Sequence, residues 1–339
     1  MKAVALTKYL PISDPESLVD VELERPVPTG RDLLVAVRAI AVNPVDTKQR
    51  APKAQIEAKP RVLGWDAAGE VVAVGPQVTL FKPGDAVFYA GDVTRAGCNC
   101  ELQLVDERIV GRKPKSLSFE QAAALPLTSI TAWEAMFDRM HIARSPYGQP
   151  PRSILLFGGA GGVGSIAIQI ANKVAGLTVI ATASRPETEK WCRDLGAHHV
   201  INHFGDMPAQ LKAIGFPAVD YVFILNDVDQ HFPSALAVVA PQGMICSIVG
   251  AKGPLDVATL MPRSVGFVWE LMFTRPRFQT HDMIAQHHLL NECSRLVDEG
   301  VIRTTMHEVL KPINAANLRK AHAMLEAGRT IGKIVLSGF

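Results

Sequence analysis

The sequence GGAGGVG, Gly158–Gly164, connects two apolar segments of different periodicity. Before it, Ile154–Phe157 is a short continuous apolar run, which is typical of a strand buried on both faces. After it, apolar residues recur from Val163 to Val174 at the spacing of an amphipathic helix. The segment therefore predicts a strand, a tight loop and a helix in succession.

Three glycines of this loop, Gly159, Gly161 and Gly164, satisfy the pattern G-x-G-x-x-G. In dinucleotide-binding loops one glycine permits the tight turn, one lets backbone N–H groups approach a pyrophosphate, and one allows the helix to pack closely on the strand. The N-terminus of the helix then favours the phosphates electrostatically. Glycine-rich turns also serve as plain connections between strands and helices, so the pattern alone leaves both interpretations open.

The residues after the next predicted strand indicate which nucleotide is bound. The apolar segment Thr178–Thr182 completes a βαβ unit. In such units an acidic residue about 20 positions beyond the glycines binds the free 2′-hydroxyl of NAD. Here Ser184 and Arg185 stand at that place, and a hydroxyl with a guanidinium suits a phosphate. We therefore predict NADPH over NADH; the alternative is that Arg185 is a solvated surface arginine.

The composition of the 339-residue chain argues against several classes of protein. A net charge of +2, with acids and bases interspersed, argues against nucleic acid as the main partner. No apolar run is long enough to span a membrane and no signal peptide precedes the first predicted strand, so we expect a cytoplasmic protein. The five cysteines are scattered and odd in number, which argues against a disulfide framework.

The first part of the chain, up to about Leu127, consists of short predicted strands broken by Gly and Pro. This density of turn signals predicts a compact, barrel-like β domain. Ser118 and Gln121 have the spacing of a capping box at the start of an alanine-rich helix. We place the crossing to a second domain there.

The second part alternates strands and helices, which predicts a doubly wound parallel sheet. The six strand candidates are Ile154–Phe157, Thr178–Thr182, His199–Ile201, Val219–Leu225, Met244–Val249 and Val265–Trp269. Two further helices, Met283–Glu299 and Ala315–Ala327, and a last strand, Lys333–Leu336, follow. Because this strand begins no further βα repeat, we interpret it as a return to the first domain.

Several landmarks together resemble the medium-chain dehydrogenase/reductase superfamily, in particular its quinone oxidoreductase and zeta-crystallin branch and the bacterial "zinc-type alcohol dehydrogenase-like" group. They are Asn43–Asp46, Leu63–Gly69, Gly84–Asp85, Thr131–Ala132, Gly158–Gly164 and Gly332–Leu336. The resemblance implies an α/β protein, with residues 128–276 as a Rossmann NADPH-binding domain. Residues 1–127 and 277–339 would then form a GroES-like, β-barrel-like catalytic domain. It also implies a homodimer.

The zinc ligands of the alcohol dehydrogenases that the chain resembles are replaced here. In those enzymes a cysteine stands at the position of Asn43, a histidine–glutamate pair at Trp65–Asp66, and another cysteine near Leu127 or Thr128. Of the residues present, Asp66 alone is a usual zinc ligand, and one carboxylate cannot hold Zn²⁺ tetrahedrally. The pair in Cys98–Cys100 is too sparse for a structural zinc site, so we interpret these cysteines as ordinary thiols. No metal is predicted.

The resemblance also implies a set of cofactor contacts. They are Asn43, Thr131, Gly159, Gly161, Gly162, Val163, Gly164, Ser184, Arg185, His203, Ile248 and Lys333. His203 stands where relatives place a tyrosine against the adenosine phosphate, and Lys333 where a residue of the closing strand reaches the cofactor. Thr131 matches a threonine at the nicotinamide; alternatively, it is a helix-interior threonine bonded to its own backbone.

Four residues are candidates for the chemistry: Asn43, Asp46, Lys48 and Thr131. The amide of Asn43 is expected to donate to the carbonyl oxygen of the substrate. Asp46 is expected to order its loop, with a direct proton role as the alternative. Related reductases often carry a tyrosine at the position of Lys48, so we expect either Lys48 or solvent to protonate the product.

A reaction without zinc needs an acceptor that stabilises its own charge, because zinc is the Lewis acid of the alcohol dehydrogenases. A quinone or an α,β-unsaturated carbonyl spreads the charge over a conjugated oxygen, which hydrogen-bond donors can hold. We therefore expect an NADPH-dependent, zinc-independent reductase of quinones or enones, with neither nucleic acid nor membrane as a partner. A zinc-type alcohol dehydrogenase and a non-catalytic NADPH-binding protein are the alternatives.

Overall fold

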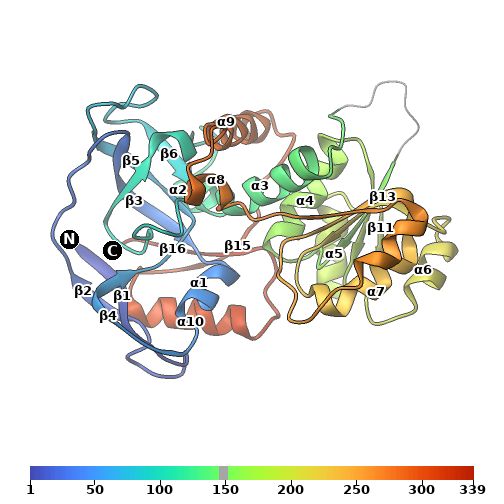
Figure 1. Cartoon of the computed structure of the whole chain (residues 1–339). Coiled ribbons are helices and arrows are strands. Elements are labelled where there is room, and N and C mark those ends of the chain that lie inside the picture. The colour runs from blue at the N-terminus through green and yellow to red at the C-terminus, as the bar shows by residue number, and fades with distance from the viewer. Residues whose placement is uncertain (145–151) are drawn as a thin grey trace. The chain divides into compact units, whose positions relative to one another are not determined.

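The computed structural model describes residues 1–144 and 152–339, which divide into two units (Figure 1). The first unit combines Met1–Ile130 with Phe273–Phe339. The second unit is the single segment Thr131–Met272. The chain therefore leaves the first unit once and later returns to it.

The second unit is built on a six-stranded parallel sheet. The strands are β9 (Ser153–Phe157), β10 (Thr178–Thr182), β11 (His199–Ile201), β12 (Val219–Ile224), β13 (Val239–Ser247) and β14 (Gly266–Trp269). Their spatial order is β11, β10, β9, β12, β13, β14, so the direction of winding reverses between β9 and β12. The predicted doubly wound parallel sheet is confirmed, although β13 begins at Val239 rather than at Met244.

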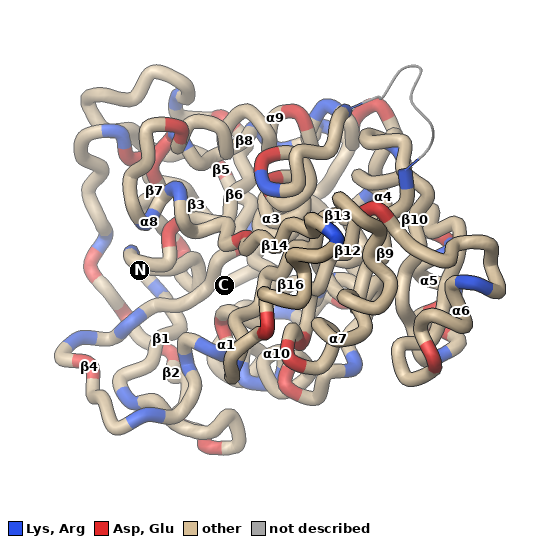
Figure 2. Tube along the Cα trace, turned by 45° about the vertical axis from the view of Figure 1, so that its right-hand side comes forward, with Lys and Arg blue, Asp and Glu red and all other residues tan. Residues whose placement is uncertain are grey.

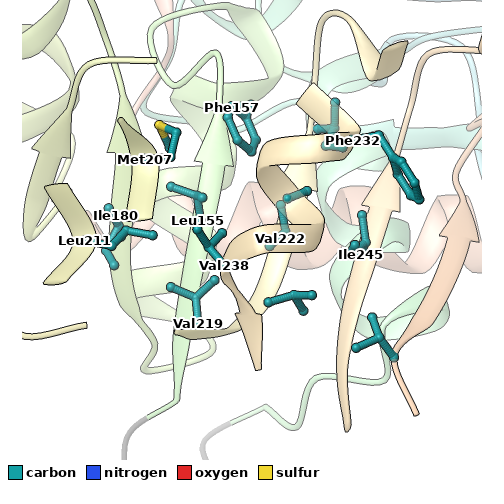
Figure 3. Packing of buried hydrophobic residues seen from close by; sticks show 14 of the residues in the cluster. Leu155, Phe157, Ile180, Met207, Leu211, Val219, Val222, Phe232, Val238 and Ile245 are labelled. Atoms are coloured by element: carbon teal, nitrogen blue, oxygen red, sulfur yellow. The ribbon is translucent and has the colours of Figure 1, made fainter. Parts of the chain in front are cut away.

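Helices between these strands bury apolar residues against the sheet (Figure 3). They are α4 (Gly162–Lys173), α5 (Pro186–Asp194), α6 (Met207–Ala213), α7 (Val228–Val238) and the 3₁₀ helix η3 (Val257–Arg263). The π-helix η2 (Glu134–Arg139) precedes β9. Leu155 and Val222 of the strands form one buried cluster with Leu211 of α6 and Val238 of α7. Because strands of this kind are covered by helices, their sequences are continuous apolar runs, which makes them recognisable.

The first unit contains one seven-stranded and one three-stranded sheet. The larger sheet has the order β15 (Met306–Leu310), β16 (Lys333–Ser337), β3 (Asp32–Ala41), β5 (Ala67–Val74), β6 (Ala86–Tyr89), β8 (Val110–Arg112), and β7 (Leu102–Asp106) also pairs with β3. The smaller sheet consists of β2 (Val19–Glu22), β1 (Lys2–Tyr9) and β4 (Lys53–Val62). Val335 of β16 lies opposite Ala41 of β3, so the last strand does return to the first unit.

Short helices complete the first unit. They are α1 (Pro44–Arg50), the 3₁₀ helix η1 (Glu107–Ile109), α2 (Phe119–Ala123), α8 (Thr274–Phe278), α9 (Ala285–Asp298) and α10 (Ala315–Glu326); α3 (Pro126–Trp133) runs across the division. The capping box of α2 is confirmed, because Gln121 N donates to Ser118 Oγ at 3.2 Å and Ser118 N donates to Gln121 Oε1 at 3.0 Å. Helices α9 and α10 are the two helices predicted before the last strand.

Lysine and arginine are interspersed with acidic residues along the chain trace of both units (Figure 2). This distribution agrees with the small net charge of +2. Among the described residues, none of the helices combines the length and the apolar composition needed to cross a bilayer.

Candidate functional site

The glycine loop of the second unit is fixed by hydrogen bonds to the end of β10. Gly158 N donates to Thr182 Oγ1 at 3.0 Å, and Gly159 N donates to Thr182 O at 3.2 Å. Helix α4 then begins at Gly162, with Gly161 as an N-cap that has no side chain to occupy the helix terminus. The first amide groups of α4 are therefore available to an anion, as in other helices that bind phosphate.

The three glycines of the motif have different surroundings. A Cβ on Gly159 would lie 2.8 Å from Ala181 Cβ, and a Cβ on Gly164 would lie 2.5 Å from Gly159 O. A Cβ on Gly161 would meet nothing closer than Gly158 O at 3.5 Å. Gly159 and Gly164 are thus needed for packing within the unit, whereas a side chain at Gly161 would meet no close contact. This arrangement fits a bound pyrophosphate at Gly161.

The structure brings Ser184, Arg185 and His203 to one edge of the sheet. Ser184 and Arg185 follow β10, and His203 follows β11, which is the neighbouring parallel strand with Ile201 opposite Thr182. Ser184 is exposed, and the other two side chains are partly exposed. Within the described part of the chain, His203 Nδ1 is buried without a hydrogen-bond partner. Burial also lowers the pKa of His203, which favours its neutral form.

Arg185 is the N-cap residue of α5, and its guanidinium lies at the surface. Its Nη1 is 3.2 Å from Glu187 Oε1, and the Arg185 side chain is 37% exposed. Its backbone N–H donates to Thr188 Oγ1 at 3.2 Å, which fixes the backbone at the start of the helix. A surface ion pair of this kind contributes little to stability, so the contact with Glu187 holds the guanidinium only weakly.

Two further predicted cofactor residues lie elsewhere in the second unit. Ile248 directly follows β13, and its N–H donates to Ile224 O at 3.2 Å, which places it at the carboxyl edge of the sheet. Thr131 lies in α3 and is only 5% exposed.

The first unit holds the other candidates, beginning with Asn43 and Asp46 at the start of α1. Asn43 is the N-cap of this helix, and its backbone N–H donates to Asp46 Oδ2 at 2.6 Å. Asp46 is 1% exposed, and burial raises its pKa to about 7 against the opposing effects of this hydrogen bond and of the Lys333 charge. These contacts support the loop-ordering role that was expected for Asp46. Lys48, on the same helix, is exposed.

The side chain of Asn43 belongs to a buried network with Asp66 and Lys333. Asn43 Nδ2 donates to Asp66 Oδ2 at 2.9 Å and to Trp65 O at 3.2 Å. Lys333 Nζ donates to Asp66 Oδ2 at 2.9 Å, to Val42 O at 2.9 Å and to Asn43 Oδ1. An ammonium has three hydrogens, and these three oxygens accept all of them. Donation by Asn43 to a substrate, or contact of Lys333 with a cofactor, therefore requires an exchange of these bonds.

From the sequence, Asp66 was interpreted only as a single possible zinc ligand. Its ion pair with Lys333 was not predicted. The pairing with Lys333 joins residues far apart in the chain, but both positions lie in the landmark segments Leu63–Gly69 and Gly332–Leu336. A buried acid and a buried lysine both need opposite charges, since an isolated ion is expensive to bury. This requirement for an opposite charge could have indicated the pairing of Asp66 with Lys333.

Asn43, Trp65 and Asp66 stand where the alcohol dehydrogenases carry zinc ligands, and they do not fit zinc. Asp66 Oδ1 accepts from Leu127 N at 2.8 Å, so both carboxylate oxygens already have partners. Trp65 is fully buried and donates through Nε1 to Asp92 O at 3.2 Å. Within residues 1–144 and 152–339, no group of three or more His, Cys, Asp and Glu gathers as metal ligands would. An amide, an indole and one carboxylate whose oxygens already accept hydrogen bonds do not make a tetrahedral zinc site.

The nearby cysteines are neutral thiols. Cys98 Sγ lies 3.3 Å from Asp66 O, and Cys100 Sγ lies 3.2 Å from Leu102 O. Burial raises the pKa of both thiols, to about 12 for Cys100. A thiolate is the form that binds metal or attacks, so the raised pKa of both thiols disfavours either role.

Family models cover both units. The alcohol dehydrogenase GroES-like domain matches residues 29–117, and a zinc-binding dehydrogenase domain matches residues 195–336. Over 337 residues, the chain is 42% identical to a zinc-type alcohol dehydrogenase-like protein of Staphylococcus aureus, with 99% of this chain and 100% of the relative covered. The chain belongs to the medium-chain dehydrogenase/reductase superfamily. As a member of this superfamily it is an oxidoreductase.

Two relatives whose names state an activity are less similar in sequence. A quinone oxidoreductase of Pseudomonas aeruginosa is 31% identical, with 95% of this chain and 96% of the relative covered. The 2-methylene-furan-3-one reductase of Solanum lycopersicum is 30% identical, with 99% of this chain and 79% of the relative covered.

Solved structures show the same superfamily fold. A putative zinc-dependent alcohol dehydrogenase of Rhizobium etli has 54% identity and a TM-score of 0.95, with 100% and 98% of the two chains covered. The Escherichia coli quinone oxidoreductase in complex with NADPH has 26% identity and a TM-score of 0.80, with 99% and 100% covered. An NAD-dependent alcohol dehydrogenase has 28% identity and a TM-score of 0.82, with both chains fully covered. Both nicotinamide cofactors thus occur among the similar structures.

Proposed function

We propose that this oxidoreductase uses NADPH to reduce quinones, or the activated C=C bond of α,β-unsaturated carbonyls, without zinc. The observation that carries the proposal is the closed network of Asn43, Asp66 and Lys333. The ammonium of Lys333 donates to Asp66 and to Asn43, which stand where the alcohol dehydrogenases carry zinc ligands. Acceptors that delocalise the incoming charge suit such a site, because they do not need a Lewis acid.

The preference for the phosphorylated cofactor rests on the residues after β10. Ser184 and Arg185 offer a hydroxyl and a cation where an acid would accept from a free ribose. Gly161 and the amide groups of α4 would hold the pyrophosphate, and His203, on the adjacent strand end, would face the adenosine phosphate. When bound, NADPH would supply the hydride. The NADPH complex of the Escherichia coli enzyme supports this choice, although relatives with NAD also exist.

The start of α1 is proposed to lie beside the substrate. Asn43 and Asp46 bond each other and hold the start of the helix in one conformation. The carbonyl end of the substrate takes up negative charge during reduction and then a proton. Lys48, exposed on the same helix, and solvent are the two proposed proton sources. Thr131 is proposed to contact the nicotinamide.

Oxidation of NADPH by a panel of quinones and enones tests the reaction. Pure protein should consume the cofactor with at least one class of acceptor, and a chelator should leave the rate unchanged, since no step uses a metal. Tight NADPH binding with no turnover on any acceptor would favour a binding protein instead.

Zinc alcohol dehydrogenase activity is the second candidate, because the zinc-binding dehydrogenase domain matches residues 195–336. That activity requires stoichiometric zinc, which elemental analysis measures directly. Zinc-dependent alcohol oxidation would replace the proposal made above.

Assembly as a homodimer is also proposed, with support from an edge of the parallel sheet. Strand β14 ends the strand order, and Trp269 on it is 47% exposed. Leu271, which follows, is 49% exposed. An open strand edge with apolar side chains favours pairing with another copy. The cytoplasmic location stays a prediction.

A further inference from the structure

A side chain of α5 reaches the helix that begins at the glycine loop. Trp191 Nε1 donates to Ser165 Oγ at 2.8 Å, so an indole on α5 contacts the first turn of α4 (Figure 1). Ser165 is fully buried and directly follows Gly164. Neither Trp191 nor Ser165 is among the predicted cofactor contacts. The bond between them nevertheless joins a second helix to the phosphate-binding loop.

The indole bond fixes the direction of the Ser165 hydroxyl group. An indole N–H can only donate, so Ser165 Oγ is the acceptor in this bond and its own hydrogen has to point elsewhere. Gly161 O lies 2.7 Å from Ser165 Oγ, whereas Ala160 O lies at 3.4 Å. The hydroxyl therefore donates to Gly161 O. Serine side chains in helices often form such a bond to the carbonyl four residues earlier, but here the indole donor selects it.

The carbonyl oxygen of Gly161 thereby accepts two hydrogen bonds from one residue. Ser165 N donates to it at 2.8 Å as the first bond of α4, in addition to the hydroxyl. Both bonds polarise the peptide group between Gly161 and Gly162, and a polarised peptide group is a stronger N–H donor. The N–H of Gly162 is the first amide of α4 and has no partner within the helix. Trp191 thus acts, through Ser165, on a peptide group that is proposed to face the pyrophosphate.

The next residue of α5 supports the glycine loop by packing. Cys192 is fully buried, and a Cβ on Gly159 would lie 3.0 Å from Cys192 Sγ. Two successive residues of α5 therefore bear on the loop, one through Ser165 and the other directly. The N-cap of α5 is Arg185, the residue proposed to bind the 2′-phosphate. The same helix thus carries one phosphate contact and supports the other.

We propose that Trp191 is a positioning residue for the cofactor, which acts through Ser165 to hold the peptide group of Gly161 in the orientation that binds the pyrophosphate. This role rests on the proposed binding of a nicotinamide dinucleotide. NADPH and NADH both contain the pyrophosphate, so Trp191 should matter equally for the two cofactors. Arg185, in contrast, should matter for NADPH alone.

Fragments of the cofactor separate the two phosphate sites. Adenosine 5′-diphosphate carries the pyrophosphate without the 2′-phosphate, and adenosine 2′-monophosphate carries the 2′-phosphate without the pyrophosphate. Isothermal titration calorimetry measures the dissociation constants of both fragments, NADPH and NADH. The proteins are wild type and Trp191→Phe, which keeps an aromatic ring but removes the N–H. Lys190→Gln is the matched control, because Lys190 precedes Trp191 on α5 and forms an exposed ion pair with Asp194.

Trp191→Phe should raise the dissociation constants of adenosine 5′-diphosphate, NADPH and NADH by about threefold to tenfold, because the loop is no longer held ready for the pyrophosphate. Binding of adenosine 2′-monophosphate should be unchanged. Arg185→Ala should show the opposite selectivity between the two fragments, and Lys190→Gln should match wild type throughout.

Ser165→Ala provides a second variant, since it removes the same link from the other side. It should reproduce the pattern of Trp191→Phe. The double variant should bind adenosine 5′-diphosphate no more weakly than the more affected single variant, because residues of one network are not additive. Thermal unfolding shows whether each variant is folded.

Unchanged binding of adenosine 5′-diphosphate by the folded variants would overturn the proposal. Equal weakening of both fragments would also overturn it, because that result indicates a general structural role, and so would the failure of both single variants to fold. If wild type binds neither dinucleotide, the proposed function fails and the role of Trp191 with it. If wild type binds NADPH and NADH equally well, only the preference for NADPH fails, and adenosine 5′-diphosphate still tests Trp191.

Discussion

Arg185 and Lys333 are both cations in predicted cofactor positions, but their surroundings differ. The Arg185 side chain is 37% exposed and pairs with a surface acid. The Lys333 side chain is 3% exposed, and protein oxygens accept all its hydrogens. A surface guanidinium can turn to an incoming phosphate, whereas the buried ammonium is committed to the protein.

Replacement of Arg185 should therefore separate the two cofactors. Arg185→Ala is expected to weaken NADPH binding about tenfold and to leave NADH binding unchanged, because only the phosphate contact is lost. Titration with each cofactor measures this. Arg193→Ala is the matched control, since Arg193 also lies on α5 in a surface ion pair, with Glu189. Equal losses for both cofactors would remove the argument for NADPH.

Replacement of Lys333 should mainly affect stability. Lys333→Met leaves Asp66 buried without its cation and is expected to cost about 3 kcal/mol in the free energy of unfolding. Urea denaturation measures this, with the exposed Lys320→Met as control. Addition of Asp66→Asn to Lys333→Met should recover part of the loss. Full additivity of the two substitutions would show that the charges are not coupled.

At the scale of elements, the sequence predicts those whose signal is local. The strands of the parallel sheet are continuous apolar runs, and Ser118 with Gln121 forms a capping box as expected. Strand β4 (Lys53–Val62) was not predicted, because it is largely exposed and charged and exists through its pairing with β1. The π turn of η2 was also missed, since it depends on backbone bonds rather than on a residue pattern.

Within the candidate site, too, some residues have a local sequence signal and others depend on tertiary structure. The glycine loop and the Ser184–Arg185 pair follow from local sequence, and the role expected for Gly161 stays a prediction. The partners of Asn43 do not follow from local sequence, because Asp66 and Lys333 reach it only in the folded chain. Local patterns predict positions, whereas hydrogen-bond partners require tertiary structure.

The glycine loop allows a matched pair of substitutions. Gly164→Ala should destabilise the protein by about 1 to 3 kcal/mol, because its methyl group would lie 2.5 Å from Gly159 O. Gly161→Ala should fold normally, since its methyl group meets nothing closer than 3.5 Å, but should bind cofactor at least about tenfold more weakly. Thermal unfolding and cofactor titration separate the two effects. Normal binding by a stable Gly161→Ala variant would contradict the pyrophosphate site.

At the scale of the whole molecule, association through β14 is the open question. Trp269→Glu places a charge on the exposed edge strand and should halve the mass measured by light scattering, because it removes apolar contact and adds repulsion. Ile56→Lys, at a 73% exposed position of β4, should leave the mass unchanged. A wild-type protein that is already monomeric would exclude the dimer.

The pairing of β16 with β3 also sets an order of events during biosynthesis. The ribosome makes β3 before the whole second unit and β16 after it, yet the two strands are neighbours in one sheet. The second unit is one uninterrupted segment, so all of it leaves the ribosome before β16 is made. Because β16 becomes available to β3 only after the second unit has been made, β3 keeps an unpaired edge during translation, and such an edge can pair with another strand.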